Sequence, residues 1–260
     1  MAPASEWSAL GPRFPDSTMS EQVRLFAASK PDAPAILTAT ESRSWRELDR
    51  RADLLASALL DRGMKPGDRL AWLGRNGLEF PTVLLAARRA RAILVGLNWR
   101  LSGGELAENL KRTAPLLVIG DQEFAGLVPS QFVFFDSAEG IDALTASATL
   151  RALPEPDPQD LTTLFFTSGT TGEPKALAYT LESAENVTFG QNTLAFAPES
   201  RLLIVAPVFH TAGWSWTQYG LAGGMTQVQL SHPHPNPFLT PWSGSASLTL
   251  NGCRRSFPTC

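Results

Sequence analysis

The chain has 260 residues, of which 43% are hydrophobic and 18% charged, and its formal net charge is −3. This composition is typical of a globular protein and argues against disorder, and no basic run is long enough to indicate nucleic-acid binding. No stretch approaches the roughly 18 apolar residues of a membrane span, and two cysteines near the C-terminus, Cys253 and Cys260, indicate neither a disulfide framework nor a metal cluster.

The N-terminal segment, residues 1–17, shows no regular pattern and is predicted to be an irregular arm. It has neither a basic start nor an apolar core, so it does not resemble a secretory signal, and we expect a cytoplasmic protein. A helix is expected over residues 19–30, because Pro31 stops it. Two short strands are expected at residues 35–39 and 42–45.

Three helix starts are marked in the next part of the chain. In two of them a serine is followed three residues later by a glutamate, which is a capping box; the pairs are Ser44 with Glu47 and Ser102 with Glu105. Asn76 is expected to cap a third helix, over residues 78–91. The basic cluster at the end of that helix should complement the helix dipole; it consists of Arg88, Arg89 and Arg91.

Short apolar runs alternate with these helices and are predicted to be strands. They lie at residues 69–73, 92–96, 116–119, 132–135 and 202–206. Alternation of strands with helices predicts an α/β fold, a mostly parallel sheet with helices on both faces. A proline-rich acidic connector over residues 152–160 precedes the next strand.

The segment LTTLFFTSGTTGEPK, residues 161–175, begins as a buried strand and becomes a loop of small residues. The loop residues are Thr167, Ser168, Gly169, Thr170, Thr171 and Gly172, and Lys175 follows. Glycines allow the backbone N–H groups to turn inward as an anion nest, and the hydroxyls and the lysine would add donors for a polyphosphate. The spacing differs from that of a Walker loop. A hydroxyl-rich hairpin turn, closed by a second strand at residues 176–179, is the alternative.

The strand at residues 202–206 continues into PVFHTAGW, residues 207–214. A histidine that follows a strand is often structural. His210, however, is expected at the carboxyl edge of a parallel strand, where α/β sheets bind ligands. We therefore treat His210 as a candidate functional residue.

The loop, with Pro174 and Lys175 behind it, resembles the phosphate loop of the AMP-forming, adenylate-forming enzymes, which include acyl-CoA synthetases. Ala176 stands where glycine is usual in that family. The segment at residues 207–214 resembles the second signature of the family, a Pro-x-Phe-His element that ends in glycine and an aromatic residue. Residues 44–59 and 97–110 carry a weaker resemblance, and there Asn98, Arg100 and Glu105 are expected to form only a turn and a helix cap.

The resemblance implies a fold, the front portion of the large N-terminal domain of such an enzyme, and a two-step reaction. A carboxylic acid, fatty or aryl, is activated by ATP as an acyl-adenylate, and the thiol of coenzyme A then displaces AMP. By the same resemblance, the residues from Thr167 to Gly172 would hold the β- and γ-phosphates, Thr167 could reach Mg²⁺, and Lys175 would support the loop or the pyrophosphate. His210 would be the catalytic residue facing the carboxylate, and Trp214 would line the acyl pocket.

The resemblance extends over residues 18–230, which are expected to be a partial AMP-binding domain. Residues 231–260 have no helix or strand period and contain both cysteines, so we expect an irregular tail, consistent with a shift of reading frame. The later family motifs, Tyr-Gly-x-Thr-Glu and Thr-Gly-Asp, are absent from the sequence. An inactive, truncated nucleotide-binding relative and an adenylation domain of another AMP-forming class, such as that of a peptide synthetase, are the alternatives.

Overall fold

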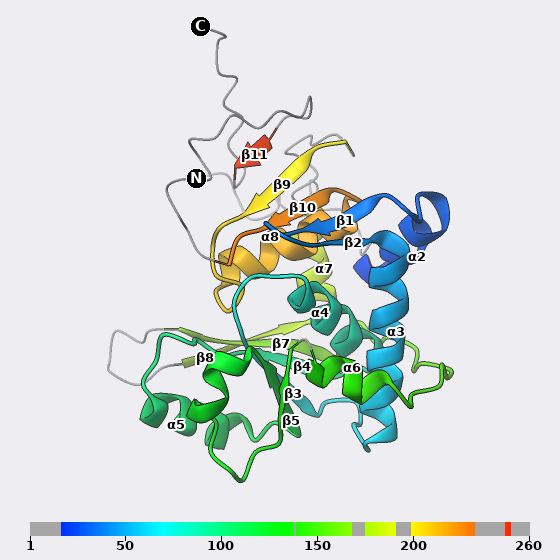
Figure 1. Cartoon of the computed structure of the whole chain (residues 1–260). Coiled ribbons are helices and arrows are strands. Elements are labelled where there is room, and N and C mark those ends of the chain that lie inside the picture. Colours follow the sequence, from blue (N-terminus) through cyan, green and yellow to red (C-terminus); the bar gives the residue numbers. More distant parts are fainter. Residues whose placement is uncertain (1–16, 138, 168–174, 191–198, 232–247, 251–260) are drawn as a thin grey trace, which may run out of the picture.

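The structure is a computed structural model that describes residues 17–137, 139–167, 175–190, 199–231 and 248–250. Its strands form two sheets with helices between and around them (Figure 1). The fold class is therefore confirmed as mostly parallel α/β. The alternation of strands and helices did not show, however, that the strands divide between two sheets.

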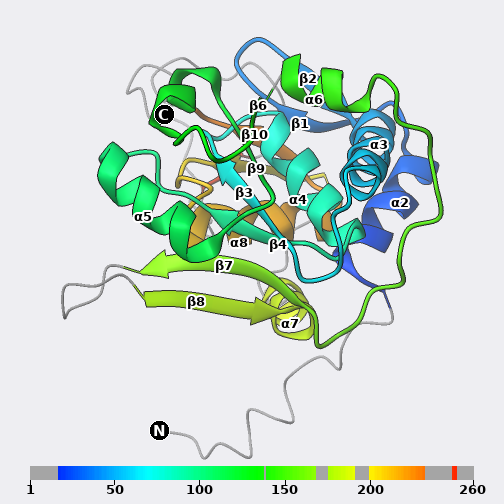
Figure 2. The same ribbon diagram turned by 90° about the horizontal axis from the view of Figure 1, so that it is seen from below.

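The larger sheet has six strands in the order β6-β5-β3-β4-β7-β8. Its strands are β3 (Arg69–Leu73), β4 (Ile93–Gly96), β5 (Leu117–Gly120), β6 (Phe134–Asp136), β7 (Leu161–Thr167) and β8 (Lys175–Thr180). All neighbours are parallel except β7 and β8, which form an antiparallel hairpin at one edge (Figure 2). The predicted strands and the predicted hairpin are thus confirmed, with ends that differ by one or two residues at most positions.

The smaller sheet has five strands in the order β11-β9-β10-β1-β2. Its strands are β1 (Pro34–Leu37), β2 (Ser42–Ser44), β9 (Arg201–Ile204), β10 (Thr226–Gln229) and β11 (Leu248–Leu250). Strand β11 pairs in parallel with β9, although the sequence indicated no strand after residue 230. The rest of the expected tail, except Ser231, lies outside the described residues, so the boundary at residue 230 stays a prediction.

The helices are α2 (Met19–Ser29), α3 (Trp45–Asp61), α4 (Glu79–Arg89), α5 (Gly103–Thr113), α6 (Glu139–Thr145), α7 (Leu181–Gly190) and α8 (Thr211–Ala222), with the 3₁₀ helix η1 at Gln122–Leu127. Helix α4 packs on β3 and β4, and α8 packs on β9 and β10, so the two helices fill the space between the sheets. On the other face of the larger sheet, α5 contributes Leu106 and Leu110 to a second cluster with Val118.

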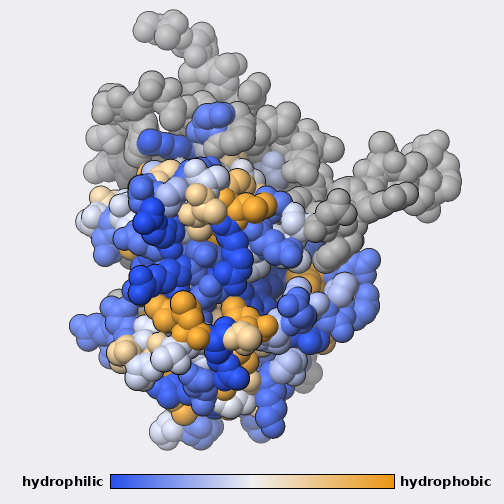
Figure 3. All heavy atoms as spheres, turned by 90° about the vertical axis from the view of Figure 1, so that its right-hand side faces the viewer, coloured by the Kyte–Doolittle hydropathy of each residue, from blue (hydrophilic) through white to orange (hydrophobic). Residues whose placement is uncertain are grey.

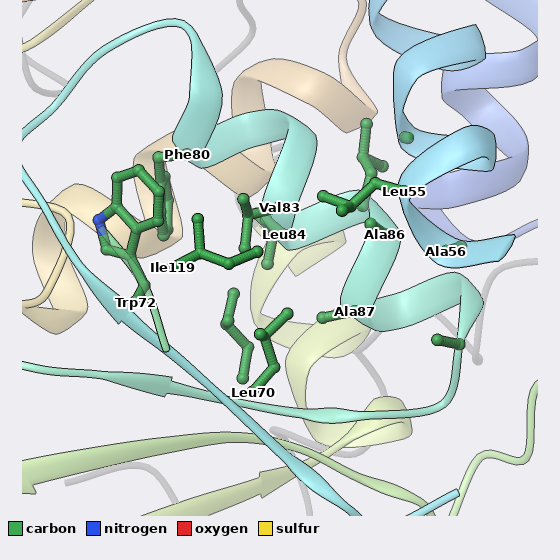
Figure 4. Packing of buried hydrophobic residues seen from close by; sticks show 14 of the residues in the cluster. Leu55, Ala56, Leu70, Trp72, Phe80, Val83, Leu84, Ala86, Ala87 and Ile119 are labelled. Carbon is green, nitrogen blue, oxygen red and sulfur yellow. The ribbon is translucent and has the colours of Figure 1, made fainter. Parts of the chain in front are cut away.

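The main core surrounds α4 (Figure 4). Phe80, Leu84 and Ala87 of this helix face Leu70 and Trp72 of the sheet and have no more than 1% of their surface exposed. Leu55 and Ala56 of α3 close the other side. Burial of a large apolar side chain contributes about 1.5–3 kcal/mol, so α4 is the element that holds the layers together.

Both predicted capping boxes are present. The Ser44 hydroxyl accepts from the backbone N–H of Glu47, and the Glu47 carboxylate accepts from the N–H of Ser44. Ser102 and Glu105 repeat this arrangement. The hydrogen bonds from Ser44 lower the pKa of the Glu47 carboxyl group. Such caps are decided within one helical turn, which explains why the sequence alone could show them.

The prediction for Asn76 was wrong. Helix α4 begins at Glu79 after Leu78, and no side chain caps it. The Asn76 amide instead donates hydrogen bonds to the carbonyl oxygens of Ile204 (3.3 Å) and Ala206 (3.0 Å), and its oxygen accepts from the Val208 N–H (3.0 Å). Asn76 is buried, so these backbone groups provide the partners that a buried amide requires.

The basic cluster at the end of α4 has more than a dipole role. Arg88 and Arg89 do lie in the last turn, as expected, but both are buried. The guanidinium of Arg89 is held by the carboxylates of Asp49 and Asp53 on α3. Arg91 follows the helix with a positive φ of 55° and is paired with Asp160.

No helix within the described ranges is long and apolar enough to cross a membrane.

Candidate functional site

The base of the predicted phosphate loop is the open end of the β7–β8 hairpin. Thr167, the last residue of β7, lies opposite Lys175, the first residue of β8, and Lys175 is exposed. The loop residues Ser168, Gly169, Thr170, Thr171 and Gly172, and the Thr167 side chain, lie outside the described residues. The hairpin thus delivers both ends of the loop, and one cation, to a single edge.

That edge is the carboxyl edge of the larger sheet. β7 runs parallel to β4, and Phe165 lies opposite Gly96, the last residue of β4. Open α/β sheets bind ligands beyond the carboxyl ends of their strands. The two ends of the loop, Thr167 and Lys175, therefore lie at the edge where folds of this class bind ligands.

The second predicted segment reaches the same edge from the smaller sheet. After β9 the chain passes Asn76, which fixes the backbone as far as Val208. It then crosses the end of β4, where a Cβ atom at Gly96 would lie 3.3 Å from the Cα of Phe209. Gly96 therefore permits the close approach of the segment that carries His210.

His210 is exposed and is the N-cap of α8. Its Nδ1 accepts a hydrogen bond of 3.3 Å from the Ala212 N–H, and its carbonyl oxygen accepts from the Trp214 N–H. An acceptor at Nδ1 requires the tautomer with the proton on Nε2. The imidazole of His210 thus caps α8. The catalytic role of His210 stays a prediction.

Trp214 has 1% of its surface exposed and lies between the two sheets. Its ring meets Phe165 of β7 edge-on at 4.7 Å and Phe80 of α4 at 5.1 Å. Together with Thr163, Phe165 and Tyr179 it lines a narrow cavity of about 40 Å³. The contact of Trp214 with Phe165 brings the two predicted segments together, although they are far apart in the sequence.

The start of α8 also depends on Gly213. A Cβ atom there would lie 2.3 Å from the carbonyl oxygen of Ala206 and 2.4 Å from that of Pro207. Only a residue without a side chain allows the helix to begin so close to the preceding turn. Gly213 therefore allows the close packing of α8 on the preceding turn that sets the positions of His210 and Trp214.

Sequence reasoning missed an aromatic cluster beside Phe209. Trp99, after β4, stacks on Phe124 at 5.7 Å and meets Phe209 edge-on at 5.9 Å. The guanidinium groups of Arg75 and Arg100 lie 4.2 Å and 4.8 Å from the centre of the Trp99 ring. Asn98 and Arg100 form the expected turn, since the Arg100 N–H donates to the Asn98 side chain. The sequence did contain a signal for this cluster, because Arg75, Asn76 and Trp99 all follow predicted strands and are therefore expected at the carboxyl edge of the sheet.

The residues described by the structure contain no group of three His, Cys, Asp or Glu side chains that could hold a metal ion. The assignment of Thr167 to Mg²⁺ stays a prediction. An exposed lysine at the base of a loop at this edge suits an anionic ligand.

The fold is that of a layered α/β protein, and the two ends of the predicted loop lie at the carboxyl edge of its larger sheet. Residues 23–242 match the family of AMP-binding enzymes. The chain belongs to this family. The match runs beyond residue 230, where the resemblance was expected to end.

Among curated proteins, the chain is 28% identical to a fatty acid–[acyl-carrier-protein] ligase, ScoC, from Streptomyces coeruleorubidus, over 82% of this chain and 43% of that protein. It is 32% identical to a feruloyl-CoA synthase from Amycolatopsis, over 72% and 38%. The chain thus spans less than half the length of these relatives.

Solved structures of similar fold include the inhibitor-bound N-terminal domain of FACL13 from Mycobacterium tuberculosis, with a TM-score of 0.78 and 23% identity over 85% of this chain and 59% of that one. A putative long-chain-fatty-acid CoA ligase from Rhodopseudomonas palustris has a TM-score of 0.77 at 24% identity, over 87% and 60%. The fold is therefore that of the N-terminal domain of adenylate-forming enzymes.

Proposed function

We propose that the protein is an AMP-forming acid–thiol ligase, which activates a carboxylic acid with ATP as an acyl-adenylate and transfers the acyl group to the thiol of coenzyme A. The observation that carries this proposal is the contact between Phe165 and Trp214. It joins the strand that leads into the loop to the segment that carries His210, at the carboxyl edge of the larger sheet.

Each predicted residue then has a role in substrate binding. Lys175 and the loop from Thr167 to Gly172 would hold the β- and γ-phosphates of ATP. His210 would orient the carboxylate through its Nε2–H, because its Nδ1 accepts from the helix backbone. Trp214, fixed by Phe80 and Gln218, would form the inner wall of the acyl pocket. Mg²⁺, when bound, would neutralise the phosphates.

The relatives support an acid of the fatty or aryl class, since one is a fatty acid ligase and another a feruloyl-CoA synthase. They differ in the thiol, which is an acyl carrier protein for the first and CoA for the second. Our proposal keeps CoA, together with the cytoplasmic location expected from the sequence.

A second candidate is nucleotide binding without catalysis by this chain. The chain covers less than half of its curated relatives, and the Thr-Gly-Asp motif, which by the family resemblance would hold the ribose of ATP, is absent from its sequence. An adenylation domain of another AMP-forming class is a further alternative, because a peptide-synthetase structure shares the fold with a TM-score of 0.75.

Exchange of labelled pyrophosphate into ATP, dependent on a fatty or aryl acid, separates these candidates. Robust exchange with the 260-residue chain would establish adenylation and overturn the expectation of inactivity. ATP binding without exchange would favour the second candidate.

Calorimetry with ATP, with and without Mg²⁺, tests the loop. Lys175→Ala should weaken ATP binding about 10- to 150-fold, since a charge-assisted hydrogen bond contributes about 1.5–3 kcal/mol and 1.4 kcal/mol is tenfold. Gly169→Val should weaken it as well. Lys111→Ala, in α5, is the matched control and should bind as the wild type does. Equal affinity in all four proteins would remove the phosphate-loop assignment.

A further inference from the structure

Two cavities of this structure differ in the charge of the side chains that line them. A cavity of about 460 Å³ beside α2 and α4 is lined by arginines and carboxylates that pair with each other, as Arg24 does with Asp53. On the side of the molecule where α2 and α3 lie, hydrophilic residues gather between two hydrophobic groups (Figure 3). The narrow cavity of about 40 Å³ beside Trp214 is different, because none of the described residues that line it is charged.

This narrow cavity lies between one side of α8 and one face of the β7–β8 hairpin. Four residues of α8 line it at spacings of three and four, which places them on the same side of the helix. They are Thr211, Trp214, Ser215 and Gln218. On the hairpin, Thr163 and Phe165 lie two residues apart and so face the same side, and Tyr179 lies opposite Thr163. Because Thr211 follows His210 directly, the cavity begins beside the residue proposed to orient the carboxylate.

Gln218 lies at the end of the cavity farthest along α8 from His210. It follows Thr211 by seven residues, roughly 10 Å along the helix axis. Its side-chain oxygen accepts from the Arg88 guanidinium at 2.7 Å and from the Trp214 Nε1–H at 3.3 Å. An enclosed cavity of about 150 Å³ holds a benzene ring, so a cavity of about 40 Å³ admits only a small group at the far end of an acid.

Hydroxyl groups and aromatic rings make up most of the lining. Tyr179, Thr211 and Ser215 are partly exposed, and their hydroxyls form no hydrogen bond with another described residue. The rings of Phe165 and Tyr179 meet edge-on at 6.1 Å, and no Leu, Ile or Val is among the described lining residues. A hydrocarbon tail would take these hydroxyls out of water without replacing their hydrogen bonds, which is unfavourable, whereas a hydroxyl group would replace them.

We propose, on the basis of the ligase function proposed above, that the acid is a hydroxylated aryl acid. Its carboxylate lies at His210, its ring lies at the mouth of the cavity against Tyr179, and its hydroxyl group enters the cavity and hydrogen-bonds to Ser215. A second carboxylate or an ammonium group at that end would be buried without a counter-charge among the described lining residues, which is costly. The proposal thus selects the aryl class over the fatty class.

Titration of the full chain by calorimetry, without nucleotide, tests the proposal with three acids. A site built to hydrogen-bond a hydroxyl group rejects an analogue that lacks it. 4-Hydroxybenzoate should therefore bind saturably and at least tenfold more tightly than benzoate. Octanoate should bind more weakly than benzoate, because its tail meets hydroxyl groups in place of an aliphatic wall.

Two variants remove a hydroxyl group from the cavity. Ser215→Ala should weaken the binding of 4-hydroxybenzoate about tenfold and leave that of benzoate unchanged, and it should fold, since alanine favours the helix. Tyr179→Phe keeps the ring and should also weaken 4-hydroxybenzoate more than benzoate. Tyr219→Phe is the matched control and should bind all three acids as the wild type does, because Tyr219 lies in a separate cluster with Leu202 and Ile204.

The proposal is overturned by equal affinity for 4-hydroxybenzoate and benzoate, by tighter binding of octanoate, by absence of saturable binding, or by an unchanged preference in both Ser215→Ala and Tyr179→Phe. Pyrophosphate exchange separates its failure from that of the proposed function. Exchange with octanoate but not with 4-hydroxybenzoate would keep the ligase and overturn the hydroxylated aryl acid. Hydroxyl-dependent binding without exchange would support the assignment of the cavity and contradict catalysis by this chain.

Discussion

Helix α4 and strand β8 differ sharply in how far their residues are buried. Every residue of α4 from Phe80 to Arg89 is buried, because the helix lies between the two sheets and against α3. In β8 the first four residues, 175–178, are exposed, since the strand ends the sheet and pairs on one side only. The scaffold around α4 is thus fixed by many buried contacts, whereas β8, the outer strand of the hairpin that leads out of the candidate loop, has few. Regions with few buried contacts open most easily.

The largest effect is expected for Phe80→Ala. Phe80 is fully buried between Trp72 and Trp214, and loss of a core aromatic ring costs about 3–5 kcal/mol. Urea unfolding followed by circular dichroism measures the change in free energy. Leu177→Ala in β8, where the side chain is 41% exposed, should cost less than about 1 kcal/mol. Similar losses for both variants would contradict the contrast between α4 and β8.

Asn76→Ala should destabilise the fold by about 2–4 kcal/mol, because backbone groups after β9 lose buried partners that each contribute about 1–3 kcal/mol. The hydrogen bonds of Asn76 to Ile204 and Ala206 link the two sheets. The matched control is Asn98→Ala, which removes a turn contact to the Arg100 N–H and should cost less. The prediction fails if the two variants unfold at the same urea concentration.

Gly213→Ala should cost about 1–3 kcal/mol, the typical penalty for overpacking, because its Cβ would overlap carbonyl oxygens of the preceding turn. Near-ultraviolet circular dichroism should also change, since Trp214 moves with the start of α8. Gly104→Ala, in the first turn of α5, is the control, because a Cβ there has nothing within 4 Å. An unchanged tryptophan signal in Gly213→Ala would show that the turn relaxes without moving the helix.

The smallest effect is expected for Glu185→Gln, and it should depend on pH. Burial raises the pKa of Glu185 in the folded state, so the folded state binds this proton more tightly than the unfolded state does. The resulting stability is present below the unfolded pKa, about 4.3, and is lost as the pH rises through the folded pKa. Relative to Glu185→Gln, the wild type should therefore become less stable with increasing pH.

Urea unfolding at several pH values between about 4 and 8 measures this difference. Glu182→Gln, one turn earlier on α7, serves as the control and should follow the wild type. A constant difference between the wild type and Glu185→Gln across that range would show that the pKa of Glu185 is the same in the folded and unfolded states.

The sequence by itself determined the local elements. Both capping boxes, strand β3 and the β7–β8 hairpin follow the prediction, because each depends on residues close together in the chain. The sequence also placed His210 after a strand at a carboxyl edge, since that follows from strand polarity. Its resemblance to the AMP-forming enzymes is confirmed by the family match.

The tertiary structure alone decided which distant residues meet. Asn76 has partners 128 to 132 residues away, and the Arg88 partner, Gln218, is 130 residues away. The split into two sheets and the burial of Trp214 against Phe165 have the same origin. A hydrophobic or polar pattern in the sequence indicates that a side chain must be buried or must find a hydrogen-bond partner. Which residue it meets depends on how the layers stack, because side-chain packing and hydrogen bonds act only at contact distance.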